Sequence, residues 1–151
     1  MTSFPEISAL LAHRGSMLLI DRILVADTDR VTVSASVDPA AWYADERGDM
    51  PGWLGVELMA QAVAAWVGLQ AWQRGEAPKR GFLLGTRDYS CRRPSFPAGS
   101  KLAVTATEAF RESNGLAAFA CTIEQSGEVM AESVLKVFEP PDFEAFMEQQ
   151  I

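Results

Sequence analysis

One carboxylate stands alone in the most apolar part of the chain. Glu57 is the only charged residue between Asp49 and Arg74. A carboxylate among apolar neighbours is costly unless it is paired, hydrogen-bonded or protonated, so Glu57 is a candidate for proton transfer. The alternative is structural, because a carboxylate near the start of a helix is favoured by the helix dipole or can face solvent on a polar stripe. The residue types alone leave both interpretations open.

The start of the same segment offers a second chemical element. Pro51 and Gly52 directly precede the apolar run. Free backbone N–H groups at a helix N-terminus can bind an oxyanion or a carbonyl oxygen. A substrate oxygen held by the Gly52 N–H would then lie close to Glu57, one turn further along. A glycine that only begins the helix is the alternative interpretation.

The chain has one histidine, His13, and two cysteines, Cys91 and Cys121. A single histidine excludes chemistry that needs a histidine cluster within one chain. The cysteines are too few and too far apart for a disulfide framework or a zinc site, so we expect reduced thiols in a cytoplasmic protein. We expect neither a metal nor a cofactor. His13 is a candidate proton carrier if the N-terminal segment folds toward Glu57, and a packed, hydrogen-bonded histidine is the alternative.

A long helix would carry Glu57. Apolar residues recur with helical spacing from about residue 52 to 74, where alanine and leucine also favour a helix. A segment of this length has to be considered as a membrane span. Glu57, Gln61 and Gln70 count against that interpretation. A helix that is apolar nearly all round, in a soluble chain, is buried inside its own domain.

Alternating apolar and polar residues predict strands on both sides of this helix. The predicted strands cover residues 31–37, 81–89, 101–110, 116–124 and 129–138. A further apolar run covers residues 17–23, residues 38–50 form a loop, and Asp142 could cap a short terminal helix. This order predicts an α+β fold, in which one antiparallel sheet wraps one helix within a single domain of residues 1–151.

Three motifs follow one another along the chain: LAHRGSMLLIDR at residues 11–22, MPGWLGVELMAQ at residues 50–61 and RRPSFPAGSKL at residues 92–102. They resemble the L-P-H-R-x-P-x-L-L-V-D-R opening, the M-P-G-x-L-x-x-E-A-M-A-Q helix and the R-P-V-x-P-G-D-x-L strand entry of the β-hydroxyacyl-ACP dehydratases, the FabA/FabZ group. The resemblance implies a hot-dog fold, a curved antiparallel sheet around a central helix. It also implies dimers with joined sheets and an active site at each end of the interface.

The resemblance further implies a catalytic pair. One member is the helix carboxylate, which Glu57 matches, and the other is a histidine of the partner subunit in a G-H-F-P-G loop fourteen residues earlier. Here that position is Tyr43, and residues 38–50 contain no histidine. Tyr43 could donate a hydrogen bond to substrate but is a poor base, because its ordinary pKa is about 10. The chain looks closer to a divergent branch of the family associated with aryl-polyene-type pathways.

Three functions are compatible with these residues. We predict a 3-hydroxyacyl-ACP dehydratase of fatty-acid or polyene/polyketide-type biosynthesis that uses Glu57, with His13 as a possible replacement for the loop histidine. The first alternative is a non-catalytic subunit that dimerises with a complete dehydratase. The second is a hot-dog thioesterase in which Glu57 activates water. Trp53, beside Gly52, could line an acyl tunnel.

Local charge predicts the partners. Thirteen Lys and Arg against twenty Asp and Glu give a net charge of −7, which argues against a nucleic-acid partner. Five basic residues still cluster with only Asp88 opposing them: Lys79, Arg80, Arg87, Arg92 and Arg93. We expect Arg92 and Arg93 to bind an acyl carrier protein or a CoA thioester through its phosphates, and a solvated strand face is the alternative. We expect no membrane partner, and either a homodimer or a heterodimer with a related hot-dog subunit.

Overall fold

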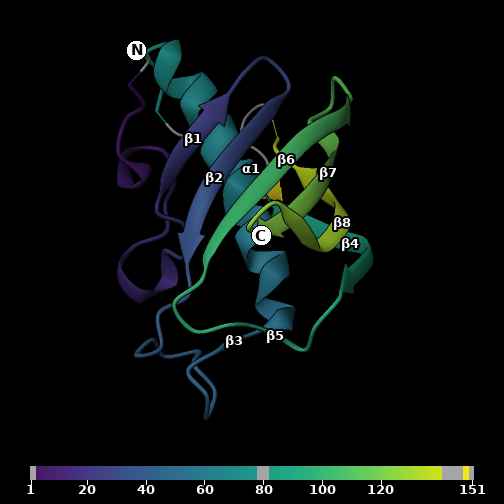
Figure 1. Cartoon of the computed structure of the whole chain (residues 1–151). Coiled ribbons are helices and arrows are strands. Elements are labelled where there is room, and N and C mark those ends of the chain that lie inside the picture. The colour runs from purple at the N-terminus through teal and green to yellow at the C-terminus, as the bar shows by residue number, and fades with distance from the viewer. Residues whose placement is uncertain (1–2, 78–81, 141–147, 150–151) are drawn as a thin grey trace.

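The computed structural model describes residues 3–77, 82–140 and 148–149. Its main sheet has six antiparallel strands in the order β1-β2-β6-β7-β8-β4, and one long helix, α1 (Gly55–Gln73), lies against the sheet (Figure 1). The strands are β1 (Arg22–Ala26), β2 (Arg30–Ser36), β4 (Phe82–Cys91), β6 (Lys101–Arg111), β7 (Leu116–Gln125) and β8 (Glu128–Phe138). This is the α+β hot-dog arrangement that the three motifs imply.

Strands β6, β7 and β8 form a meander joined by two tight turns. At the second turn Ser126 has φ 53° and Gly127 has φ 80°, the left-handed conformations that a two-residue hairpin turn requires. Along β2, buried residues alternate with half-buried ones, so its apolar side chains face the helix. The predicted strands at 31–37, 101–110, 116–124 and 129–138 are confirmed to within a residue at each end.

Helix α1 fills the concave side of the sheet. Its buried side chains include Leu58, Met59 and Trp66. The helix begins after a 3-10 turn, η3 (Gly52–Leu54), so the predicted helix over 52–74 is confirmed with this change at its start. Its length and hydropathy would allow a membrane span, but 67% of the most apolar window is buried inside the fold. Packing against the sheet therefore accounts for its apolar composition.

The N-terminal segment packs directly against α1. It contains two 3-10 turns, η1 (Ile7–Ala9) and η2 (Gly15–Met17). The backbone of this segment approaches the helix closely, because a Cβ atom on Gly68 would collide with the carbonyl of Leu10. Glycine at this point of α1 thus lets the opening segment lie directly on the helix.

Two features near the N-terminal half differ from expectation. The apolar run at 17–23 contains only the last residue of η2 and the start of β1, which continues to Ala26. The pairing of β1 is irregular between Ile23 and Val25, so its alternation of buried residues is broken and the strand is hard to recognise. Short strands β3 (Met50–Pro51) and β5 (Ser95–Phe96) also pair, which the sequence did not indicate. Residue 142, the predicted cap, lies outside the described residues.

Candidate functional site

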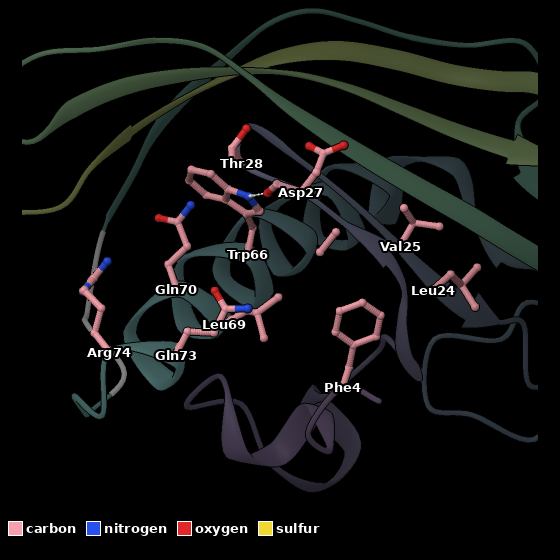
Figure 2. Close-up of a pocket in the computed structure, with 11 residues that line it drawn as sticks. Phe4, Leu24, Val25, Asp27, Thr28, Trp66, Leu69, Gln70, Gln73 and Arg74 are labelled. Atoms are coloured by element: carbon pink, nitrogen blue, oxygen red, sulfur yellow. Dashed lines mark hydrogen bonds between the residues drawn. The ribbon is translucent and has the colours of Figure 1, made fainter. Parts of the chain in front are cut away.

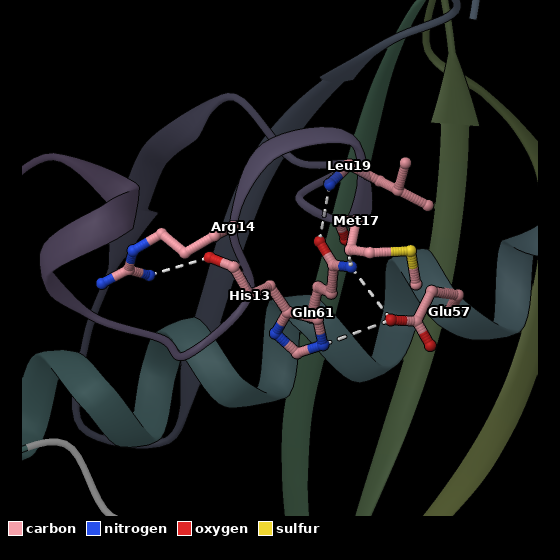
Figure 3. Close-up of polar contacts among 6 residues, drawn as sticks. All are labelled: His13, Arg14, Met17, Leu19, Glu57 and Gln61. Carbon is pink, nitrogen blue, oxygen red and sulfur yellow. Dashed lines mark hydrogen bonds and ion pairs between the residues drawn. The ribbon is translucent and has the colours of Figure 1, made fainter. Parts of the chain in front are cut away.

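The opening segment brings His13 to Glu57. The imidazole Nε2 of His13 lies 3.4 Å from Oε1 of Glu57, and each side chain is about one-third exposed, at 35% and 36%. Glu57 projects from the first turn of α1, and η2 begins two residues after His13. Figure 3 shows the imidazole pointing from this segment onto the carboxylate. The only histidine of the chain therefore pairs with the lone carboxylate of the helix.

A buried amide completes this arrangement. Gln61 is fully buried, and its Nε2 donates to Glu57 Oε1 at 2.9 Å and to the Met17 carbonyl at 2.8 Å. Its Oε1 accepts from the Leu19 N–H at 2.9 Å. In the sequence, Gln61 is the last residue of the MPGWLGVELMAQ motif and a polar residue that counts against a membrane span, and neither feature indicates a contact with Glu57. The signal that could have found it is its spacing, because residues four apart on a helix face one another.

His13 and Glu57 stand at one end of an apolar pocket of about 230 Å³. Beyond these two residues, the pocket is lined by Ala60, Val63, Ala64, Val67, Leu83, Val137, Phe138 and Glu139. The helical residues follow the 57, 60, 64, 67 spacing, which places them on one face of α1. Ten residues of helix correspond to roughly 15 Å, so the pocket continues along α1 away from the carboxylate. The pocket is therefore polar at the end formed by His13 and Glu57 and mostly apolar along the rest of its length.

Two polar atoms of the pair have no partner within the part of the chain that the structure describes. The Nδ1 atom of His13 is buried without a hydrogen bond. A buried N–H without an acceptor is costly, so the neutral tautomer with its proton on Nε2, facing Glu57, is favoured. The second carboxylate oxygen, Oε2, points away from both Gln61 and His13 (Figure 3). A carboxylate with one oxygen held and the other open can take up and return a proton.

The predicted role of Gly52 as an oxyanion donor is wrong in this chain. Its N–H donates to the Pro94 carbonyl at 2.8 Å and is not free. The reason is the pairing of β3 with β5, which draws this turn against residues 94–96 before the helix begins. The Gly52 carbonyl in turn accepts from the Tyr89 hydroxyl. Burial, with a smaller contribution from the neighbouring Cys91, raises the pKa of Tyr89, so the phenol stays a donor.

The other predicted substrate-binding residues lie outside the His13–Glu57 pocket. Trp53 is 66% exposed and shares a shallow surface depression with Gly52, Arg92 and Arg93. Arg92 pairs with an exposed glutamate, Glu128, at 3.7 Å. The structure thus brings these residues together beside the start of α1, although not at the carboxylate. Lys79 and Arg80 of the predicted basic cluster lie outside the described residues.

Tyr43 is buried and separate from both of these surfaces. Its hydroxyl accepts the Asp38 N–H at 2.9 Å, and its ring packs edge-to-face against Trp42 with ring centroids 5.6 Å apart. Tyr43 therefore stabilises the loop at residues 38–50. It does not take the place of the missing loop histidine at the Glu57 carboxylate, since it is not among the residues that line that pocket.

A curved sheet around one helix, with a carboxylate and a histidine at the head of an apolar pocket, defines this chain as a hot-dog protein of the dehydratase group. It matches the ApeP-like family, described as ApeP dehydratase, over residues 5–148. The chain belongs to this family.

Two relatives agree with this assignment. The 3-hydroxyacyl-[acyl-carrier-protein] dehydratase FabZ of Thermus thermophilus is 35% identical over 136 residues, which cover 86% of this chain and 92% of the relative. A chain of the dehydratase heterocomplex ApeI:P from Xenorhabdus doucetiae matches with a TM-score of 0.89 and 25% identity. The match covers 99% of this chain and 100% of that chain. A protein from Streptococcus pneumoniae described as a hypothetical thioesterase, with TM-score 0.62, 13% identity and coverage of 78% of this chain and 84% of that one, shares the fold alone.

Proposed function

We propose that this protein dehydrates 3-hydroxyacyl thioesters at the His13–Glu57 pocket. The observation that carries the proposal is the 3.4 Å contact between His13 Nε2 and Glu57 Oε1, at the head of an apolar pocket. A carboxylate supported by two nitrogen donors has one oxygen left for proton exchange. The apolar body of the pocket has the shape and polarity to hold an acyl chain, with the thioester end at the carboxylate.

In the proposed reaction Glu57 Oε2 removes the proton from the carbon next to the thioester carbonyl. The electron pair forms the new carbon–carbon double bond as the bond from the neighbouring carbon to its hydroxyl breaks. The proton on Oε2 then passes to the departing hydroxyl, which leaves as water and returns Glu57 to its carboxylate form. His13 keeps its Nε2–H directed at Oε1 throughout, so the carboxylate stays oriented while its charge changes.

The carrier of the acyl chain would approach beside the start of α1. Arg92 and Arg93 are exposed there next to Trp53, on the depression that flanks the helix. We propose that these guanidinium groups bind the phosphate of a pantetheine arm, on an acyl carrier protein or on CoA, because arginine matches phosphate geometry with two donors. This chemistry belongs in the cytoplasm, in fatty-acid or aryl-polyene-type synthesis.

The partner subunit would pair with the β4 edge of the sheet. Strand β4 has a neighbour on one side only, and Leu83 and Leu84 on it are exposed. Leu83 also lines the apolar pocket, so a strand added at this edge would cover the pocket as well as the open edge. The printed description of the ApeI:P complex as a heterocomplex supports a related hot-dog subunit as the partner.

A second candidate function follows from the missing loop histidine. Residues 38–50 contain none, so Glu57 could complete a site with the loop histidine of a partner subunit instead of working with His13. The two candidates differ in what the isolated chain can do. A self-sufficient dehydratase turns over alone, whereas a shared site needs the mixed dimer.

The test incubates the purified protein with 3-hydroxyacyl-, 2-enoyl- and saturated acyl-carrier-protein thioesters, alone and mixed with a histidine-containing hot-dog subunit. We expect interconversion of the hydroxyacyl and enoyl thioesters by the protein alone. Activity only in the mixture would assign the shared site. Free acid from the saturated thioester would identify a thioesterase, and inertness in all mixtures would contradict the proposed function.

The assembly is tested by two matched substitutions on opposite edges. Leu84→Lys places a charge at the β4 edge, and Val25→Lys does the same at the β1 edge, where the native side chains are 57% and 52% exposed. We expect Leu84→Lys to dissociate the dimer in light scattering and Val25→Lys to leave it intact. The reverse outcome would place the interface at β1.

A further inference from the structure

We propose that Tyr89 positions the two arginines of the proposed phosphate site relative to the start of helix α1, an inference that rests on the proposed function. Tyr89 lies near the end of β4, and Arg92 and Arg93 directly follow that strand. The Tyr89 hydroxyl donates to the carbonyl of Gly52, in the η3 turn that leads into α1. It therefore links the strand that leads to the arginines with the turn that leads to Glu57.

The backbone of β4 directs this side chain toward the helix. Asp88 has φ 52°, a left-handed conformation that residues other than glycine adopt at a cost in free energy. The pairing of β4 with β8 shifts its register at the same place, between Arg87 and Ser90. Such a bulge changes the direction of the neighbouring side chain. Tyr89 is accordingly half-buried, whereas Asp88 and Ser90 on either side of it are exposed.

Two glycines at the start of the helix make room for this segment. A Cβ atom on Gly55 would collide with the Tyr89 hydroxyl. A Cβ atom on Gly52 would lie 2.9 Å from the Pro94 carbonyl oxygen, which also accepts the Gly52 N–H. Residues 89–94 thus bind both backbone polar groups of Gly52, the N–H through Pro94 and the carbonyl through Tyr89. The helix start and the arginine segment are packed against each other.

The sheet alone supports the arginines only on one side. Strand β4 is the edge strand of the six-stranded sheet, and its register is irregular shortly before the arginines. The Arg92 N–H donates to the Met130 carbonyl at 2.9 Å, which attaches the segment to β8 and not to α1. One pantetheine arm joins the carrier phosphate to the thioester, so both ends bind productively only if the arginines keep their distance from Glu57. The Tyr89 hydroxyl helps to fix that distance.

The first test compares two thioesters, of which only one carries phosphate. Tyr89→Phe removes the hydroxyl alone. With a 3-hydroxyacyl-CoA, we expect KM to rise about threefold to tenfold and kcat to stay within about twofold, the effect of one hydrogen bond on binding. With the matching 3-hydroxyacyl-pantetheine thioester, which has no phosphate, both constants should stay within about twofold. Equal losses with the two substrates, or no loss with either, would overturn the proposal.

Further variants separate positioning from general stability. Adding Tyr89→Phe to the Arg92→Ala, Arg93→Ala double variant should raise KM for the CoA thioester no further, because Tyr89 acts through these arginines. A full additional rise would overturn that role. Tyr43→Phe is the matched control, since its hydroxyl accepts the Asp38 N–H in a loop that belongs to neither surface. We expect it to leave both KM values unchanged.

The second test needs no turnover. If the protein turns over no thioester, the affinities for CoA and for pantetheine, measured by calorimetry, replace KM. Tyr89→Phe should weaken the first and not the second, and a change in both or in neither would overturn the proposal. Hydrogen exchange should also become faster in peptides covering residues 50–54 and 90–94, and Gly55→Ala, which displaces the phenol from Gly52, should reproduce this change. Unchanged exchange in Tyr89→Phe overturns the positioning role, whether or not the protein is a dehydratase.

Discussion

Two pockets, called hollows below, flank helix α1, and they differ in how far their polar groups are already hydrogen-bonded or ion-paired. The smaller, about 230 Å³, has His13 and Glu57 at its head near the start of the helix. The larger, about 780 Å³, lies near the end of the helix between Phe4, Trp66 and Arg74 (Figure 2). By volume alone the larger hollow would be the candidate site. The chemistry of the lining residues points to the smaller one.

Two of the polar side chains that line the larger hollow, Trp66 and Arg74, are already engaged. The indole N–H of Trp66 donates to the Asp27 carbonyl at 3.2 Å, and Arg74 pairs with Glu76 at 3.3 Å. Hydrogen bonding to Asp29 lowers the pKa of Asp27, so this carboxylate stays ionised. The smaller hollow is instead lined by His13, whose buried Nδ1 has no hydrogen-bond partner among the described residues, and by Glu57. Unused polar atoms beside an apolar wall indicate a site more clearly than size does.

The largest expected effect is at the carboxylate. Glu57→Gln keeps the size of the side chain and an acceptor for Gln61 but removes proton exchange, so turnover of 3-hydroxyacyl thioesters should fall by at least about a hundredfold. Stability should stay the same or rise, because a neutral amide is cheaper to bury than a charge. Enoyl-thioester absorbance and thermal unfolding measure the two quantities. Full activity in Glu57→Gln would make the carboxylate structural.

The second-largest effect is expected at His13, which either donates a hydrogen bond to Glu57 or carries the proton itself. His13→Ala removes the donor to Glu57 and should lower kcat about tenfold to a hundredfold, the value of a hydrogen bond to a charged group. His13→Gln supplies an N–H in place of the imidazole and should recover part of this loss. If the glutamine variant is as inactive as the alanine variant, while both remain folded, His13 itself carries the proton.

A smaller effect distinguishes the two hollows directly. Ala64→Phe fills the apolar body of the smaller hollow, and Gln70→Phe places the same ring in the larger one. We expect Ala64→Phe to lower kcat/KM about tenfold for long acyl chains and less for short ones. Gln70→Phe should not change it. Equal losses for both variants, or for both chain lengths, would contradict the assignment of the acyl pocket.

The smallest expected effect concerns stability alone. Trp66→Phe keeps the edge-to-face contact with Phe119 but removes the bond to Asp27, and should cost about 1 kcal/mol of unfolding free energy. Activity per folded molecule should not change, because Trp66 belongs to the core beside the larger hollow. Chemical denaturation measures the first quantity and the thioester assay the second. A loss of turnover in Trp66→Phe would mean that the larger hollow takes part in the reaction.

The secondary structure follows largely from local patterns. The long helix and the three strands after residue 100 are predicted to within about three residues, because buried faces impose a 3.6- or two-residue period on apolar side chains. Strand β1 escaped recognition, since it is an edge strand with exposed Leu24 and Val25 and an irregular register. The pairing of β3 with β5 escaped it too. Two-residue strands are too short to show any period.

The candidate site was only partly predictable. Glu57 is conspicuous in the sequence because it is a lone charge in an apolar helix, and Gly52 was wrongly assigned because its N–H is used by a strand pairing invisible in the sequence. The helix, most of the strands and the carboxylate are therefore readable from the sequence, because they depend on local periodicity and composition. The contact of His13 with Glu57 is not. That contact depends on how the opening segment crosses α1, held by Gln61 through hydrogen bonds between residues more than forty positions apart.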